Sequence, residues 1–461
     1  MNRDPAHPYI PNVAQPVREE MLRDIGVGSI DELYATIPER LRFRGRLNLP
    51  QPFRSEAELA RHMDEMLSMN TSPNSYLSFL GYGCYPHYVP EVCSEINGRA
   101  EFLTAYAGEP YEDHGKWQAI FEYVSLMADL LEMDVVSVPT YDGYQAAATS
   151  LRMAGRISHR GHVLIASPIA PAKLAMIEAY LEGAMTLEVI PPDSTTGTVD
   201  LDLVARLVHA DCAAVYLEMP NIGGVVEIAA RELAQIAHDA GALMVCSVDP
   251  ICLGFLAAPA TWGADIVCGD IQSLGLGLHF GGANGGFIAV HDDERFVFEL
   301  PSRLFGLAPT SRAGEIGFCD VAYERTSLAM RDEGVEWVGT AAALWGITAG
   351  VFLSLLGPTG LTDIGETVAA RTRYAMNKFA AIPGAHVLHA ASPHWREFVV
   401  KYDSISVQEL NTQLRRIGIF GGVDLSSEFP EMGNASLYCV TETHTLEDID
   451  RLVESVELIL R

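Results

Sequence analysis

The stretch GADIVCGDIQSLGLGLHFGGANGGFIAV, residues 263–290, places a polar, glycine-rich turn between two short apolar runs. The runs ADIVCGD (264–270) and GGFIAV (285–290) have the length and composition of buried strands. Continuous apolar strands are typical of a sheet that is covered by helices on both faces. The turn Gln-Ser-Leu-Gly (272–275) contains no lysine.

The same alternation of strand and helix extends upstream from this stretch. Buried strands are expected at HVLIAS (162–167), AAVYLEMP (213–220) and ALMVCSVDP (242–250). Helical segments lie between them, at residues 172–183, 200–209 and 230–241. Strands that alternate with helices predict an α/β fold with a mostly parallel central sheet.

The pattern changes along the chain and divides it into three parts. Residues 1–75 are polar, with two capped helical segments, and are expected to form an N-terminal arm. Residues 76–345 are expected to form the large α/β domain. Short strands and short helices in residues 346–461 predict a smaller α+β C-terminal domain.

Composition limits the classes of partner. The chain has 461 residues, is 49% hydrophobic and carries a formal net charge of −29. Such an acidic surface repels phosphate backbones and anionic lipid, so neither nucleic acid nor a membrane is expected as a partner. No uncharged apolar run reaches the length of a membrane span, and the N-terminal residues lack a signal core. We therefore expect a cytoplasmic protein.

Cysteine and lysine usage is informative about chemistry. None of the eight cysteines forms a Cys-x-x-Cys pair, so buried free thiols are expected and no metal site. The chain has four lysines, and none lies between Lys173 and Lys378. Arginine, the other basic residue, does not form a Schiff base with an aldehyde cofactor.

Asp249 follows a buried strand, at the edge of the sheet where α/β proteins bind ligands. In enzymes that use pyridoxal phosphate, an Asp in this place pairs with the pyridinium nitrogen. The lysine that would hold that cofactor is expected near residues 272–275 and is absent there. Asp249 is therefore a weak cofactor candidate, and capping of the following turn is the alternative.

The loop SFLGYGCYPHYVP (78–90) gathers polar aromatic side chains between glycines and prolines. Tyr85, His87 and Tyr88 suit the lining of a site or a subunit interface, and ordinary surface packing is the alternative.

Two further segments follow predicted strands. Tyr141 and Asp142 precede a helix whose N-terminus could bind an anion, although Asp142 would repel one and could instead cap the helix. Asn221 lies at the expected sheet edge, where a turn role and a ligand role are equally open.

Taken together, these segments resemble the α-type subunit (subunit 1) of the two-chain glycine decarboxylase, the P-protein of the glycine cleavage system. The resemblance covers nearly the whole chain in order. The matching runs include IGVGSIDELYATIPE, SFLGYGCYPHYVP, EFLTAY, MDVVSVPTYDG, PNIGGVVE, AHDAGALMVCSVDPICLG, GADIVCGDIQSLG and PEMGNASLYCVTET.

The resemblance implies a type I aminotransferase-like fold and a divided active site. In this family one subunit carries pyridoxal phosphate on a lysine and the α-type subunit does not, so a lysine-free turn is what the resemblance implies. The family decarboxylates glycine and transfers the aminomethyl group to the lipoyl arm of the H-protein. The partners expected from the resemblance are a β-type subunit that binds the cofactor, in an α2β2 assembly, and a lipoylated H-protein-like carrier.

The chain departs from the family pattern in two segments. Residues 107–117, directly after Tyr106, introduce Asp113 and His114. In residues 331–346, Glu333 stands where the family has a lysine and Trp337 where it has an asparagine.

Tyr106 and Trp337 are accordingly further candidates for lining a site or an interface. A paralogous complex that decarboxylates another amino acid is one alternative. The others are a scaffold or regulatory pseudoenzyme, and drift on a helix face that has no catalytic role.

Overall fold

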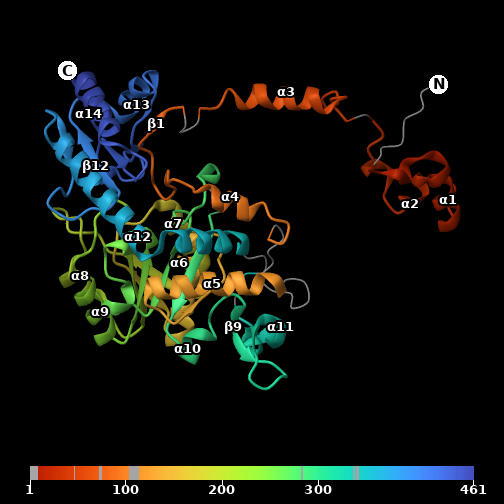
Figure 1. Cartoon of the computed structure of the whole chain (residues 1–461), viewed down its shortest axis with the longest axis horizontal. Helices are drawn as coiled ribbons and strands as arrows, with labels where there is room; N and C mark the ends of the chain where they lie inside the picture. The colour runs from red at the N-terminus through yellow and green to blue at the C-terminus, as the bar shows by residue number, and fades with distance from the viewer. Residues whose placement is uncertain are drawn as a thin grey trace. The chain divides into compact units, whose positions relative to one another are not determined.

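The computed structural model describes residues 9–45, 47–71, 75–102, 114–281, 284–335, 338 and 342–461. The chain forms two compact units, Met1–Asn70 and Thr71–Arg461 (Figure 1). The expected three-part division stays a prediction, and its second boundary would fall inside a single long helix, Ala343–Ala380.

The described residues of the first unit form short helices that bury no side chain in a core. Its helices are α1 (Gln15–Ile25), α2 (Ile30–Leu33) and α3 (Glu56–Leu67). Ser55 caps α3 by accepting a hydrogen bond from the Glu58 N–H, at 3.2 Å. None of the side chains described between residues 9 and 70 is buried.

The second unit is built on a seven-stranded sheet with the order β2-β8-β7-β6-β5-β3-β4. The pairs among β7, β6, β5, β3 and β4 are parallel, and β8 joins β7 and β2 in antiparallel fashion. The expected mostly parallel sheet is therefore confirmed. The strands are β2 (Val135–Val136), β3 (His162–Ile165), β4 (Thr186–Val189), β5 (Cys212–Met219), β6 (Leu243–Val248), β7 (Ile266–Asp270) and β8 (Gly286–Val290).

Helices cover both faces of this sheet (Figure 1). Alternate residues of β5 show why: Val215 and Leu217 join one hydrophobic core, and Ala214 and Tyr216 join the other. The first core includes α5 (His114–Leu131), α8 (Leu201–Leu207), α9 (Ala230–Asp239) and part of α12 (Ala343–Ala380). The second includes α6 (Gly143–Ser158), α7 (Pro171–Leu181) and α10 (Glu294–Val297).

A four-stranded antiparallel sheet with the order β11-β12-β15-β14 forms the C-terminal part of the second unit. Its strands are β11 (Ala385–Val387), β12 (Glu397–Tyr402), β14 (Val423–Asp424) and β15 (Ala435–Cys439). It packs with α13 (Val407–Arg416), α14 (Leu446–Leu460) and the C-terminal half of α12. Because α12 contributes to this core and to that of the large sheet, it connects the two sheets.

Shorter elements complete the second unit. Strand β1 (Leu77–Ser78) pairs in parallel with β13 (Ile419–Phe420), and β9 (Leu304–Pro309) forms a hairpin with β10 (Ile316–Val321). The other α-helices of the described residues are α4 (Glu91–Asn97) and α11 (Ser327–Met330). By length and hydropathy α12 could cross a membrane, but it is interrupted at Gly357 and contributes to both cores.

The lysine-free turn connects β7 to β8 and packs against α12. Gly275 has a φ of 84°, and a Cβ atom there would lie 2.9 Å from the Cβ of Phe352 and 3.0 Å from the Cys93 sulfur. Glycine is therefore required at this position by conformation and by space. The turn is a packed structural element in this chain.

Candidate functional site

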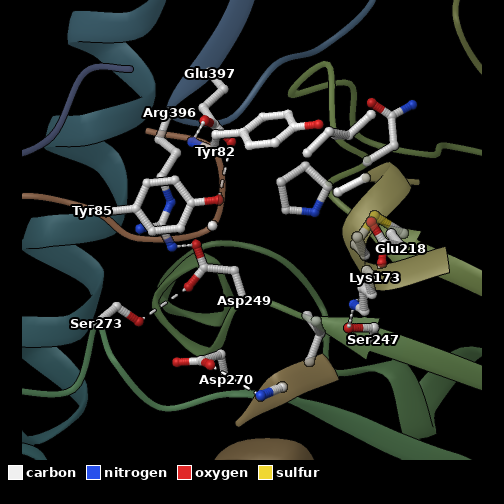
Figure 2. Close-up of a pocket in the computed structure, with 18 of the residues that line it drawn as sticks. Tyr82, Tyr85, Lys173, Glu218, Ser247, Asp249, Asp270, Ser273, Arg396 and Glu397 are labelled. Carbon is white, nitrogen blue, oxygen red and sulfur yellow. Dashed lines mark hydrogen bonds and ion pairs between the residues drawn. The ribbon is translucent and has the colours of Figure 1, made fainter. Parts of the chain in front are cut away.

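A cavity of about 120 Å³ lies at the carboxyl ends of β5, β6 and β7, where parallel strands of α/β proteins bind ligands (Figure 2). Each strand brings an acidic residue to it: Glu218 from β5, Asp249 from the residue after β6 and Asp270 from the end of β7. The loop 78–90 and the residues that begin β12 complete its wall. The cavity thus lies between the two sheets.

Lys173 is the lysine that lines this cavity, and it enters from α7. Its Nζ lies 2.6 Å from Glu218 Oε1 and donates a hydrogen bond to Ser247 Oγ at 3.1 Å. Burial acts to lower the pKa of Lys173, but the adjacent Glu218 carboxylate outweighs it and the pKa is raised. Lys173 is therefore a protonated ion-pair partner, which is a poor nucleophile.

The Asp249 carboxylate is fully engaged by its own chain, and Figure 2 shows its contacts with Ser273 and Arg396. Its Oδ1 accepts hydrogen bonds from the Ile251 N–H at 3.1 Å and from Ser273 Oγ at 3.4 Å. Its Oδ2 accepts one from Trp395 Nε1 at 2.9 Å and forms an ion pair with Arg396. Asp249 also provides the cap of the short helix Pro250–Gly254, as the alternative interpretation of the sequence expected.

Tyr85 lies in the cavity wall and fixes the loop 78–90 to both sheets. Its N–H donates to Gln272 Oε1 at 3.0 Å, and Gln272 Nε2 donates back to the Tyr85 carbonyl at 2.9 Å. On the other side, the Tyr85 hydroxyl and the Tyr82 N–H donate to Glu397, at 3.0 and 2.7 Å. Burial raises the pKa of Glu397 to about 7, although these hydrogen bonds favour the charged form.

His87 is buried between Glu442 and Arg396. Its Nδ1 lies 2.7 Å from Glu442 Oε2, and Arg396 Nη1 lies 2.7 Å from its Nε2. Because a guanidinium only donates, Nε2 accepts and Nδ1 carries the proton that is donated to Glu442. Burial lowers the pKa of His87, which keeps it neutral.

Glu442 also fixes the outer end of the loop. Burial alone would raise the pKa of Glu442, but hydrogen bonds from His87 and from the Tyr88 N–H bring it to about 2. The ring of Tyr88 is exposed to solvent, so only the backbone of this candidate takes part in the network.

The N-terminus of α6 is occupied by two carboxylates. Asp142 caps the helix by accepting from the Gln145 N–H at 2.7 Å, and Asp270 accepts from the Gly143 N–H at 3.0 Å. Burial raises the pKa of Asp270 to about 7. Tyr141 is half exposed and its N–H donates to Gln145 Oε1 at 2.9 Å. Of the two roles weighed for Asp142, the structure shows the cap.

Asn221 lines the cavity and also organises a turn. Its Oδ1 accepts from the N–H groups of Gly223 and Val225, at 2.9 and 3.2 Å, and its Nδ2 donates to the Gly197 carbonyl at 3.0 Å. Both of its side-chain groups are thus used within the chain. Tyr106 and Trp337 lie outside the described residues.

The residues of this cavity do not fit pyridoxal phosphate. The turn 272–275 offers no lysine for a Schiff base, and Lys173 is protonated and paired with Glu218. The carboxylate that would receive a pyridinium nitrogen already binds Arg396. A phosphate at the N-terminus of α6 would meet two acidic side chains. Within the described residues, no cluster of three His, Cys, Asp or Glu could hold a metal ion either.

Sequence reasoning missed several of the residues that shape the cavity. Glu218 and Asp270 could have been predicted from the sequence, because each lies at the carboxyl end of a predicted strand, as Asp249 does. Arg396 and Glu397 carried no comparable signal, since they lie just before and at the start of a strand of the other sheet. Lys173 lies in a mostly apolar helix, which does not indicate its partner 45 positions further along the chain.

A sequence profile described as "Glycine cleavage system P-protein" matches residues 7–456. A protein of Staphylothermus marinus described as "Probable glycine dehydrogenase (decarboxylating) subunit 1" is 36% identical over 466 residues, which cover 99% of this chain and 98% of that protein. A protein of Chlorobium phaeobacteroides with the same description is 37% identical over 450 residues, which cover 97% of this chain and 98% of that protein.

A crystal structure of glycine decarboxylase (P-protein) of the glycine cleavage system, in inhibitor-bound form, superimposes with a TM-score of 0.86. The two chains are 30% identical, and the match covers 97% of this chain and 98% of the other. The profile, the relatives and this structure agree over nearly the full length, so the chain belongs to the glycine cleavage system P-protein family, as a subunit 1 of glycine dehydrogenase (decarboxylating).

Proposed function

We propose that this chain is the subunit of a pyridoxal phosphate-dependent glycine dehydrogenase (aminomethyl-transferring, decarboxylating) that holds no cofactor itself. A partner subunit carries the cofactor on its own lysine, and this chain completes that partner's active site. The enzyme transfers the aminomethyl group of glycine to a lipoylated H-protein-like carrier. An α2β2 assembly is the simplest arrangement for such a pair of related chains.

The pairing of Asp249 with Arg396 carries this proposal. Pyridoxal phosphate chemistry relies on an acidic partner at the pyridinium nitrogen and on a lysine that forms the Schiff base. In this chain the acid is occupied and the lysine position is part of a packed turn. The chemistry therefore has to take place on another chain, and the relatives' description as subunit 1 agrees with the existence of one.

Co-expression with a cofactor-bearing subunit 2 tests the proposal. We expect a stable complex with one pyridoxal phosphate for each pair of chains, measured by cofactor release and by mass. The full chain alone is expected to show no cofactor absorbance, and borohydride reduction should leave no pyridoxyl group on Lys173. A pyridoxyl-lysine on this chain would contradict the proposal.

The substrate is tested on the same complex. Labelled bicarbonate should exchange into the carboxyl group of glycine when lipoylated H-protein is present. No exchange with glycine, together with decarboxylation of a bulkier amino acid, would favour the paralogous complex. No turnover of any amino acid in an otherwise stable complex would favour a scaffold.

A further inference from the structure

Four buried or half-buried side chains connect the small sheet to the large sheet in one line: Glu442, His87, Arg396 and Asp249. Glu442 follows β15 and Arg396 precedes β12, so both belong to the small sheet. Asp249 follows β6 of the large sheet, and His87 lies in the loop 78–90. Each member contacts the next through a hydrogen bond or an ion pair.

Arg396 is at the centre of this line and is only 1% exposed. Its guanidinium lies over the ring of Tyr85, with 3.8 Å between the guanidinium carbon and the ring centroid. One nitrogen donates to His87, and another pairs with Asp249. A planar group with several donors can make all three contacts at once, which a lysine ammonium cannot do.

We propose that Arg396 permanently occupies the Asp249 carboxylate, as an internal substitute for a cofactor ring, and thereby locks the loop 78–90 and the small sheet onto the large sheet. This inference rests on the proposed function and extends it. Arg396 is the residue that excludes a pyridine ring from Asp249, and His87 is a positioning residue that holds Arg396 in place. The small sheet and the large sheet therefore stay together around the cavity, here called the cleft, whether or not substrate is present.

Competition at Asp249 explains why the lock persists. A ring that entered would have to displace the guanidinium and would leave a buried cation without its partner. It would also leave His87 Nε2 without a donor and break the stack on Tyr85. The neighbouring Trp395 N–H holds the carboxylate in the same orientation, at 2.9 Å.

Amide hydrogen exchange measures how firmly the Arg396–Asp249 contact (the lock) holds the loop 78–90. Three backbone N–H groups of this loop donate hydrogen bonds to side chains around the cavity. Those of Tyr82, Tyr85 and Tyr88 donate to Glu397, Gln272 and Glu442. In the full chain we expect Arg396→Met to accelerate exchange of residues 78–90 about tenfold or more. The matched control is Arg373→Met, an exposed arginine that donates to the Ala390 carbonyl, and it should leave the loop unchanged.

Two further variants keep the test decisive. If Arg396→Met does not fold, the exchange of residues 78–90 is measured in Asp249→Asn, where we also expect acceleration. This substitution is nearly isosteric and keeps an acceptor for Trp395. The double variant Asp249→Asn/Arg396→Met should accelerate exchange by less than the product of the two single effects, because both groups act through one contact. Unchanged exchange in the folded single variants, or equal acceleration in Arg373→Met, would overturn the lock.

Pyridoxine tests whether Arg396 keeps a pyridine ring away from Asp249. It carries the pyridine ring but has no phosphate and no aldehyde. Binding is expected to Arg396→Ala, and neither to the wild-type chain nor to Asp249→Asn/Arg396→Ala, as followed by ligand-observed NMR. Pyridoxine binding to the wild type that is lost in Asp249→Asn would overturn the inference, and so would the absence of binding to a folded Arg396→Ala.

These measurements are made on the chain itself and need no glycine turnover. Failure of bicarbonate exchange in the complex would count against the proposed function and would leave the exchange rates of the loop unaffected. Failure of the lock in a chain that supports glycine turnover would count against the present inference alone.

Discussion

The cavity that lies between the two sheets buries charged side chains, whereas the N-terminal unit exposes apolar ones. In the cleft, charged side chains are buried, and each finds a partner within the chain: Lys173 with Glu218, and Arg396 with Asp249. Between residues 9 and 70 the situation is reversed, because no described side chain is buried and the apolar ones face solvent. A part that satisfies its own charges needs no ligand, whereas an amphipathic segment without a core needs another surface.

The largest expected effect concerns that exposed apolar surface. Leu59, Met63 and Met66 share one face of α3 and are 45%, 46% and 49% exposed. If this face binds the partner subunit, Leu59→Gln/Met63→Gln should weaken association by about 3–6 kcal/mol, from the apolar contact that is lost together with the cost of burying two amides in an apolar interface. Sedimentation of the complex over a dilution series measures this.

The opposite face of α3 provides the control. Arg61→Gln/Glu65→Gln also introduces two glutamines, but on the opposite face, and should leave the dissociation constant nearly unchanged. Equal weakening by both pairs of substitutions would show that the comparison between the two faces is wrong.

Breaking the ion pair between Lys173 and Glu218, which also lines the cavity, should have the next largest effect. Lys173→Met leaves Glu218 buried without a cation, and we expect a loss of about 3–5 kcal/mol in the free energy of unfolding. The control is Lys378→Met, whose ion pair with Asp450 is about as short, at 2.8 Å, but exposed, and it should leave the free energy of unfolding nearly unchanged. Urea denaturation compares the two, and equal losses would remove the distinction between buried and exposed charge.

The pH dependence of stability tests the cleft by titration. Glu397 faces Tyr85, Arg396 and Cys439, and burial raises its pKa from 4.5 to about 7. The folded state therefore binds this proton more tightly than the unfolded state, and the resulting stability is complete below pH 4.5 and lost as the pH rises through 7. The size of this contribution is of order 3 kcal/mol.

Glu397→Gln removes that titration. We expect the difference in unfolding free energy between the wild type and this variant to change between about pH 4.5 and 7, in the direction of relative loss for the wild type as the pH rises. A difference that stays constant across this range would mean that folding does not raise the pKa of Glu397.

The sequence allowed prediction of the elements that repeat a local pattern. AAVYLEMP was expected as a strand at 213–220 and is β5, Cys212–Met219, because a continuous apolar run identifies a strand buried on both faces. The contacts of the cleft are of a different kind. Arg396 and Asp249 are 147 positions apart, and no local periodicity indicates that a residue of the small sheet meets the end of β6.

The candidate residues show the same limit. The loop 78–90 attracted attention through its composition, but sequence could not show that His87 and Tyr85 hold Arg396 while the Tyr88 ring faces solvent. Asp142 and Asn221 each had two open roles, and only the placement of neighbouring N–H groups decides between them. Long-range pairing thus separates what could be predicted from what could not.

Both parts of the chain contain a helix with a side-chain cap, and removing either cap should change stability only slightly. Asp142 caps α6 in the second unit and Ser55 caps α3 in the N-terminal unit. Asp142→Ala should lower the free energy of unfolding of the chain by about 1 kcal/mol. Ser55→Ala should leave the main unfolding transition unchanged, because α3 contributes no buried side chain to it, and should reduce only the helicity of the N-terminal unit. Calorimetry and circular dichroism separate the two, and a shift of the main transition by Ser55→Ala would show that α3 unfolds together with the core.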